Sequence, residues 1–89
     1  MKRLEGKRAI VTGGASGIGK AIVQMFVNEG ARVIVADIDI KSAAALGKEL
    51  NDKAKPFELN VTSGDNFQSL INFCEKEYKG LDVIVNNAG

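Results

Sequence analysis

The sequence contains no histidine, no tryptophan and only one cysteine among its 89 residues. A single cysteine cannot form an internal disulfide, and without histidine the common zinc ligand sets cannot be assembled, so we expect no metal site. Lysine and arginine number 12 against 11 for aspartate and glutamate. This excess is too small for the broad positive field that binds a nucleic acid backbone, so we expect no nucleic acid partner.

Long apolar runs are also missing. No stretch approaches the roughly 18 apolar residues that a membrane-spanning helix needs, and the polar start of the chain lacks the apolar core of a secretory signal. We therefore expect no membrane partner and a cytoplasmic location. Apolar residues make up 45% of the chain and charged residues 26%, which is the balance of an ordinary folded protein, and the length suffices for one small domain.

Short runs rich in β-branched residues alternate with longer segments of helical periodicity, a pattern typical of a parallel sheet with crossover helices. We expect four strands, at residues 8–12, 32–37, 55–60 and 83–85, with three helices between them. Right-handed crossovers favour the strand order 3-2-1-4. The predicted fold is a three-layer α/β domain of the Rossmann type with a partial, four-stranded sheet that spans residues 1–89.

Local signals predict where the helices begin and end and which faces they bury. Gly30 is suited to a left-handed stop after the first helix, Asp39 to the N-cap of the second, and residues 62–65 to a capping box before the third. The apolar stripe expected on the first helix consists of Ile18, Ile22, Met25 and Phe26. The stripe expected on the third helix consists of Phe67, Leu70, Ile71, Cys74 and Tyr78, which makes Cys74 a core residue.

Four of the ten glycines fall between Gly13 and Gly19, where the first strand turns into the first helix. Glycine allows positive φ and close approach of a ligand to the backbone, and a helix start offers free N–H groups to a phosphate, so this loop predicts a diphosphate site. A mononucleotide P-loop is nearly matched, but Ala21 stands where a hydroxyl would bind Mg²⁺. The common G-x-G-x-x-G pattern fails at Ile22, so the loop alone leaves the nucleotide open.

Asp37 ends the second predicted strand, roughly 20 residues after the glycine loop, where a carboxylate can reach the adenosine ribose of a dinucleotide. It can accept hydrogen bonds from both ribose hydroxyls and would repel the 2′-phosphate of NADP. No basic side chain stands at Ser16 or Ile38 to pair with that phosphate. The sequence therefore favours NAD over NADP, the alternative being that Asp37 merely begins the turn towards Asp39.

Three motifs in order resemble those of the short-chain dehydrogenase/reductases along all 89 residues. They are Thr12-Gly13-x-x-x-Gly17-x-Gly19, Asn60-Val61 after the third strand and Asn86-Asn87-Ala88-Gly89 after the fourth. The resemblance implies that Gly13 and Gly17 shape the loop and that Ser16 and the Ile18 backbone meet the phosphates and ribose of the cofactor. It implies that Asp37 and Ile38 hold the adenosine ribose, that Asn60 and Val61 border the adenine, and that Asn87 and Ala88 line the crevice near the cofactor ribose. Gly19 and Gly89 are also expected among the cofactor-binding residues. The family often has aspartate at Asn60, but an amide oxygen can still accept from the adenine amino group. For Asn86 we expect a structural role that ties the fourth strand to the first.

Catalysis in this family relies on a Tyr-x-x-x-Lys pair, a serine and a further asparagine beyond the Asn-Asn-Ala-Gly motif. None of that segment is present, and Tyr78 is followed four residues later by Asp82 instead of lysine. The resemblance therefore implies the NAD-binding N-terminal half of an oxidoreductase that interconverts a small-molecule alcohol and carbonyl, with no catalytic residue here and no activity of the chain alone. The alternative is a stand-alone dinucleotide-binding or assembly module. Since the last strand would form an apolar sheet edge, we also expect self-association or a complementing C-terminal polypeptide.

Overall fold

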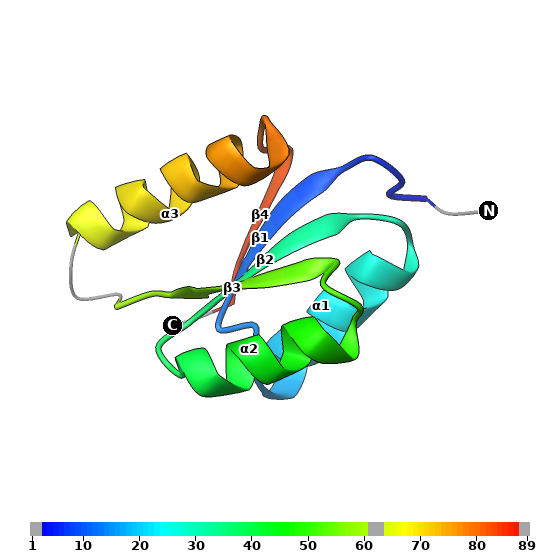
Figure 1. The fold of residues 1–89 in the computed structure, drawn as a ribbon, viewed down its shortest axis with the longest axis horizontal. Coiled ribbons are helices and arrows are strands. Elements are labelled where there is room, and N and C mark those ends of the chain that lie inside the picture. Colours follow the sequence, from blue (N-terminus) through cyan, green and yellow to red (C-terminus); the bar gives the residue numbers. More distant parts are fainter. Residues whose placement is uncertain (1–2, 61–63, 88–89) are drawn as a thin grey trace.

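A computed structural model describes residues 3–60 and 64–87 and contains seven alternating elements. In chain order they are β1 (Arg8–Thr12), α1 (Gly17–Asn28), β2 (Arg32–Asp37), α2 (Ile40–Glu49), β3 (Ala54–Glu58), α3 (Gly64–Tyr78) and β4 (Val83–Asn86). The strands are all parallel and form one sheet in the order β3-β2-β1-β4. Figure 1 shows α1 and α2 on one side of the sheet and α3 on the other, which confirms the predicted three-layer α/β fold.

Both faces of the sheet are apolar because helices cover both. Successive strand residues point to opposite sides, so in β1 Val11 joins the cluster under α1 and α2 while Ile10 joins the cluster under α3. Leu70 and Cys74 complete the second cluster and are fully buried. The Cys74 thiol donates to the Gly80 carbonyl at 3.5 Å, and burial raises its pKa, as expected for a core cysteine rather than a reactive one.

The first helix packs on a face that only partly matches the predicted one, since Ile22 and Phe26 do pack against the core cluster. Its buried residues are Gly19, Val23 and Val27, whereas Ile18 and Met25 are 74% and 56% exposed. Gly19 fixes this rotation because it lies directly against the preceding loop, and the residues four and eight positions later then follow it onto the sheet. The prediction that Ile18 and Met25 pack inward was therefore wrong.

Of the other local predictions, the bounds of the third strand were wrong, whereas the roles of Asp39 and Gly30 at helix ends were confirmed. The third strand begins and ends earlier than residues 55–60, although Pro56 does lie on an edge strand. Asp39 caps α2 by accepting from the Ser42 amide at 3.1 Å, and Gly30 adopts a φ of 99° just after α1. The predicted capping box begins at residue 62, outside the described residues.

On α3, one predicted stripe residue stays partly outside the core and an unpredicted residue packs instead. Phe67 is exposed, while Phe73 packs against Phe57 of β3 with ring centroids 5.3 Å apart. The pair extends the cluster under α3 towards the β3 edge of the sheet.

The amino ends of β1 and β4 are joined by charged side chains. The Arg8 guanidinium donates to both oxygens of Asp82, at 2.9 and 3.2 Å, and to the Lys79 carbonyl at 2.9 Å. The hydrogen bond from Arg8 lowers the pKa of Asp82 to about 2. These contacts hold β4 beside β1 at the end opposite the glycine loop. In the described parts of the chain, no helix is long and apolar enough to cross a membrane.

Candidate functional site

The carboxyl ends of the four parallel strands lie at the same end of the sheet. Residues singled out from the sequence lie at or just after each of these strand ends. The glycine loop follows β1, Asp37 ends β2, Asn60 lies just after β3 and Asn87 just after β4. Open α/β sheets bind ligands at this carboxyl end, at the point where the strand order reverses. Three further predicted site residues, Val61, Ala88 and Gly89, lie outside the described residues.

The glycine loop requires glycine for two separate reasons. Gly13 and Gly17 have positive φ angles of 64° and 56°, which other residues adopt with strain. A Cβ atom on Gly19 would lie 2.0 Å from the Gly13 carbonyl oxygen, so only glycine lets the loop fold back onto the helix. At Gly17, in contrast, nothing lies within 4 Å of the Cβ position. We therefore call the loop closed at Gly19, where a side chain has no space, and open at Gly17, where it has space.

Among the described residues, no side chain of the N-cap position binds the first amide groups of helix α1. Ser16 occupies the N-cap with an extended backbone, but its side chain makes no capping hydrogen bond, and the first turn holds no acidic residue. The first N–H groups of a helix have no acceptor within the helix. Together with the positive end of the helix dipole, they form an environment suited to an anion such as a phosphate.

Asp37 lies against the glycine loop. One of its carboxylate oxygens, Oδ2, accepts from the Ala15 amide at 3.0 Å, and the other, Oδ1, accepts from the Asp39 amide at 2.9 Å. The structure thus combines both interpretations of this residue, since it contacts the predicted site and also begins the turn towards Asp39. A carboxylate has about four acceptor positions, so each oxygen can take a further hydrogen bond.

The end of β4 is tied to the same loop through Thr12. The hydroxyl of this buried residue lies 3.1 Å from Asn86 Oδ1 and accepts from the Asn87 amide at 3.0 Å. The side-chain amide of Asn87 donates to the Gly13 carbonyl at 3.2 Å. Asn86 therefore makes the predicted tie to β1. Asn87 makes a second one, directly to the glycine loop, which sequence reasoning missed.

Sequence reasoning placed Thr12 in a motif without giving it a role, and it missed Ala15. Thr12 carried a usable signal, because it is a hydroxyl residue that ends an otherwise apolar strand immediately before two glycines. Ala15 carried none, since its contribution is a backbone amide whose acceptor lies 22 residues further along the chain.

Asn60 follows directly after a residue that contacts Asp37, whereas Tyr78 lies at the other end of the sheet. The amide of Leu59 donates to the Asp37 carbonyl at 3.0 Å, and the amide of Asn60 donates to Asn66 Oδ1. The Tyr78 hydroxyl instead donates at 3.2 Å to the carbonyl of Val33, near the start of β2, and burial raises its pKa to about 12. Tyr78 is thus a packed residue at the amino end of the sheet.

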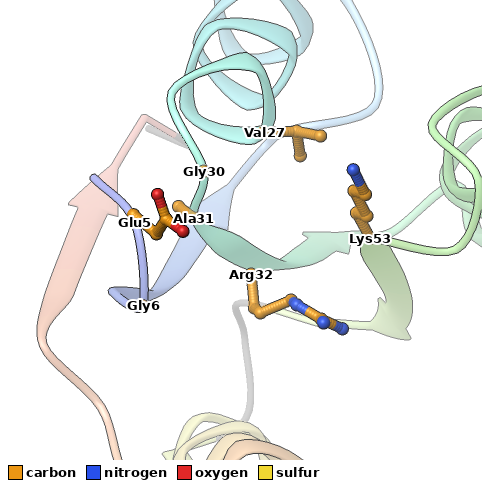
Figure 2. Close-up of a pocket in the computed structure, with 7 residues that line it drawn as sticks. All are labelled: Glu5, Gly6, Val27, Gly30, Ala31, Arg32 and Lys53. Atoms are coloured by element: carbon orange, nitrogen blue, oxygen red, sulfur yellow. The ribbon is translucent and has the colours of Figure 1, made fainter. Parts of the chain in front are cut away.

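A separate cavity lies at the amino ends of the strands (Figure 2). It has a volume of about 240 Å³ and is lined by Glu5, Gly6, Val27, Gly30, Ala31, Arg32 and Lys53. Figure 2 shows the side chains of Arg32 and Lys53 pointing in different directions, so their charges do not converge on one point. None of the predicted site residues lines this cavity.

Known proteins resemble this chain in both sequence and structure. A family model described as short chain dehydrogenase matches residues 7–89. The chain is 46% identical over 90 residues to a 3-oxoacyl-[acyl-carrier-protein] reductase of Thermotoga maritima and 40% identical over 89 residues to 3beta-hydroxysteroid dehydrogenase 2 of Eggerthella lenta. These matches cover 98% and 97% of this chain but 37% and 34% of the relatives.

Two solved structures share the fold. A hydroxysteroid dehydrogenase from Escherichia coli aligns over 98% of this chain and 38% of its own, with a TM-score of 0.93 and 37% identity. A 3-ketoacyl-(acyl-carrier-protein) reductase from Brucella melitensis, complexed with NADH, aligns over 91% of this chain and 34% of its own, with a TM-score of 0.87 and 26% identity. The chain spans little more than a third of these relatives. Because the family model covers nearly its whole length, the chain belongs to the short-chain dehydrogenase family.

Proposed function

We propose that this chain binds NAD and forms the cofactor-binding part of an oxidoreductase that interconverts an alcohol and a carbonyl compound. The observation that carries the proposal is the contact between Asp37 and the Ala15 amide. It brings a ribose-binding carboxylate next to a loop that leads into a helix start suited to phosphate. Support comes from the Brucella melitensis reductase, which shares the fold and was crystallised with NADH.

The residues present fit a dinucleotide. The open side of the loop at Gly17 leaves room for a diphosphate to approach the first-turn amides of α1. Ile18 and Ile38 are 74% and 69% exposed, which suits apolar contact with the faces of a bound cofactor. The proposed contacts with the cofactor are Gly13, Ser16, Gly17, Ile18, Gly19, Asp37, Ile38, Asn60, Val61, Asn87, Ala88 and Gly89.

The preference for NAD over NADP rests on charge. Two unit charges 4 Å apart repel by about 1 kcal/mol even in bulk water, so a 2′-phosphate beside the Asp37 carboxylate is disfavoured. Neither Ser16 nor Ile38 supplies a positive charge that would offset this repulsion. The free acceptor positions of Asp37 suit the two ribose hydroxyls of NAD instead.

In this proposal the chain binds and orients but does not catalyse. When bound, NAD supplies the acceptor for the hydride that an alcohol carbon loses as it becomes a carbonyl. That reaction also needs a group within hydrogen-bond reach that takes the hydroxyl proton. Tyr78 does not serve, because its hydroxyl is hydrogen-bonded inside the fold, away from the carboxyl ends of the strands. We therefore assign no catalytic residue to this chain and expect no activity from it alone.

Calorimetric titration with NAD and NADP tests the cofactor assignment. We expect tighter binding of NAD, and we expect Asp37→Ala to lower NAD affinity by about tenfold, the effect of losing one charged hydrogen bond, so that the preference collapses. Asp39→Ala is the matched control, because it removes a neighbouring carboxylate that caps α2 instead of contacting the loop. Equal affinities of the unmodified chain for NAD and NADP would contradict the proposal that Asp37 selects NAD.

The exposed edge of β4 suggests a partner. Within the described residues β4 pairs with β1 alone, and Ile84 on this strand is exposed. Unpaired strand edges recruit other strands, so we expect self-association or binding of a complementing polypeptide. Light scattering during size exclusion checks this, and a stable monomer at high concentration would contradict it. A cytoplasmic location stays a prediction.

A further inference from the structure

Three consecutive amides of the glycine loop are held by the end of β2. The amides of Gly13 and Gly14 donate to the Ala36 carbonyl at 2.7 and 3.4 Å, and the amide of Ala15 donates to Asp37 Oδ2 at 3.0 Å. The first two amides share one acceptor, a backbone carbonyl that is present whatever the side chain at position 36. The acceptor of the third amide is a side chain, so a substitution at Asp37 alone can remove it.

The carboxylate of Asp37 is held in the orientation that this contact requires. Its second oxygen accepts from the Asp39 amide at 2.9 Å, and two hydrogen bonds through different oxygens fix the plane of the group. Ala15 is buried, and a buried amide that loses its acceptor costs free energy comparable to the lost bond. Removal of this carboxylate therefore leaves the loop without its last attachment to β2, directly before Ser16 and the start of α1.

We propose that Asp37 is a positioning residue for the diphosphate loop, in addition to its proposed contact with ribose. This inference rests on the proposed function, because it concerns the same site. A single carboxylate then sets both the choice of cofactor and the shape of the loop that receives the diphosphate. A substitution that removes the choice between NAD and NADP also weakens binding of the part of the ligand that both cofactors share.

Inorganic pyrophosphate is the probe that separates the two roles, since it has no ribose. Simple electrostatics predicts that removal of a nearby negative charge strengthens binding of this anion, whereas loss of a loop attachment weakens it. Asp37→Ala and Asp37→Asn are equally neutral, but asparagine keeps one side-chain oxygen that can accept from the Ala15 amide. A comparison of these two variants cancels the change in charge.

The experiment is an NMR titration of the 89-residue chain with pyrophosphate, followed at the amides of Gly17, Ile18 and Gly19. We expect Asp37→Asn to bind pyrophosphate about threefold or more tightly than Asp37→Ala, the size of a modest hydrogen-bond effect. Asp39→Ala serves as the control that disturbs the same turn without touching the loop, and we expect it to bind as the unmodified chain does. Equal affinities of the asparagine and alanine variants overturn the positioning role.

Hydrogen exchange of the Ala15 amide gives a second readout that does not depend on a variant that folds. In the unmodified chain we expect this loop amide to exchange at least tenfold more slowly than an exposed amide, because the carboxylate occupies it. Exchange at the rate of an exposed amide overturns the proposal. If the unmodified chain prefers NAD but the two neutral variants bind pyrophosphate equally, only the positioning role is contradicted. Tighter pyrophosphate binding by Asp37→Asn than by Asp37→Ala, without any preference for NAD in the unmodified chain, removes the proposed cofactor assignment and leaves the positioning role standing.

Discussion

The two ends of the parallel sheet differ in the groups that they leave available to a ligand. At the amino end, side chains pair with one another or with the backbone, as in the contacts of Arg8 with Asp82 and of Tyr78 with Val33. At the carboxyl end, a helix begins without a side-chain cap and the apolar side chains of Ile18 and Ile38 are exposed. Side chains such as Asp37 and Asn87 are also hydrogen-bonded at the carboxyl end, but this end additionally offers helix-start donors and apolar surface to a ligand. The difference predicts that substitutions at the amino end change stability without changing ligand binding, whereas substitutions at the carboxyl end can change both.

The largest effect is expected from Gly19→Ala at the carboxyl end. The new Cβ would meet the Gly13 carbonyl at 2.0 Å, so the loop must move, at a cost of about 1–3 kcal/mol in the free energy of unfolding. We expect NAD binding to be lost with it. Urea unfolding and calorimetric titration measure the two effects.

Gly17→Ala is the matched control for that substitution. Its backbone has positive φ, but nothing lies within 4 Å of the new atom, so only strain of about 1 kcal/mol is expected. A Gly17 variant that loses as much stability as the Gly19 variant would contradict the assignment of Gly19 as the closed point of the loop.

A smaller effect is expected at the amino end from Tyr78→Phe. The substitution removes the hydrogen bond to the Val33 carbonyl and should lower the free energy of unfolding by about 1 kcal/mol, with NAD affinity unchanged. Burial raises the folded pKa of Tyr78 to about 12 from an ordinary 10, so its stabilising contribution is complete below pH 10 and is lost as pH rises towards 12. Ultraviolet titration of this phenol, the only tyrosine in the chain, checks the shift. A weaker affinity for NAD in the phenylalanine variant would argue that the two ends are coupled.

The smallest effect, and the one most sensitive to pH, is expected from Asp82→Ala. The hydrogen bonds from Arg8 lower the folded pKa of Asp82 to about 2 from an ordinary value of 3.8. A lowered pKa stabilises the fold above pH 3.8, and the contribution disappears as pH falls towards 2. Urea unfolding of the unmodified chain and of Asp82→Ala should therefore show a lower free energy of unfolding for the variant at neutral pH. Near pH 2 the two free energies should become equal. A difference that persists at pH 2 would show that Asp82 acts by packing and not by charge.

Local chemistry allowed much of the fold to be predicted, because strand runs, the Asp39 cap and the stop at Gly30 depend on residues close in sequence. The rotation of α1 could not be predicted, since it depends on the contact of Gly19 with a folded loop. In the candidate site, Asp37 could be proposed from its position, but its bond to Ala15 could not, because backbone donors carry no sequence signal. The pairing of Arg8 with Asp82 joins residues 74 positions apart, beyond the reach of periodicity.

The contacts that shape the glycine loop also bear on the order in which the molecule folds. Its hydrogen bonds reach 22 residues ahead to Asp37 and 74 residues ahead to Asn87. Closing long loops of chain costs entropy before any contact repays it, so the most distant attachments are expected to form late. Refolding monitored by pulse-labelled exchange of the loop amides would reveal the sequence of events. A nascent chain would then gain its affinity for nucleotide only after β4 has docked against β1, so half-formed molecules would not capture the ligand prematurely.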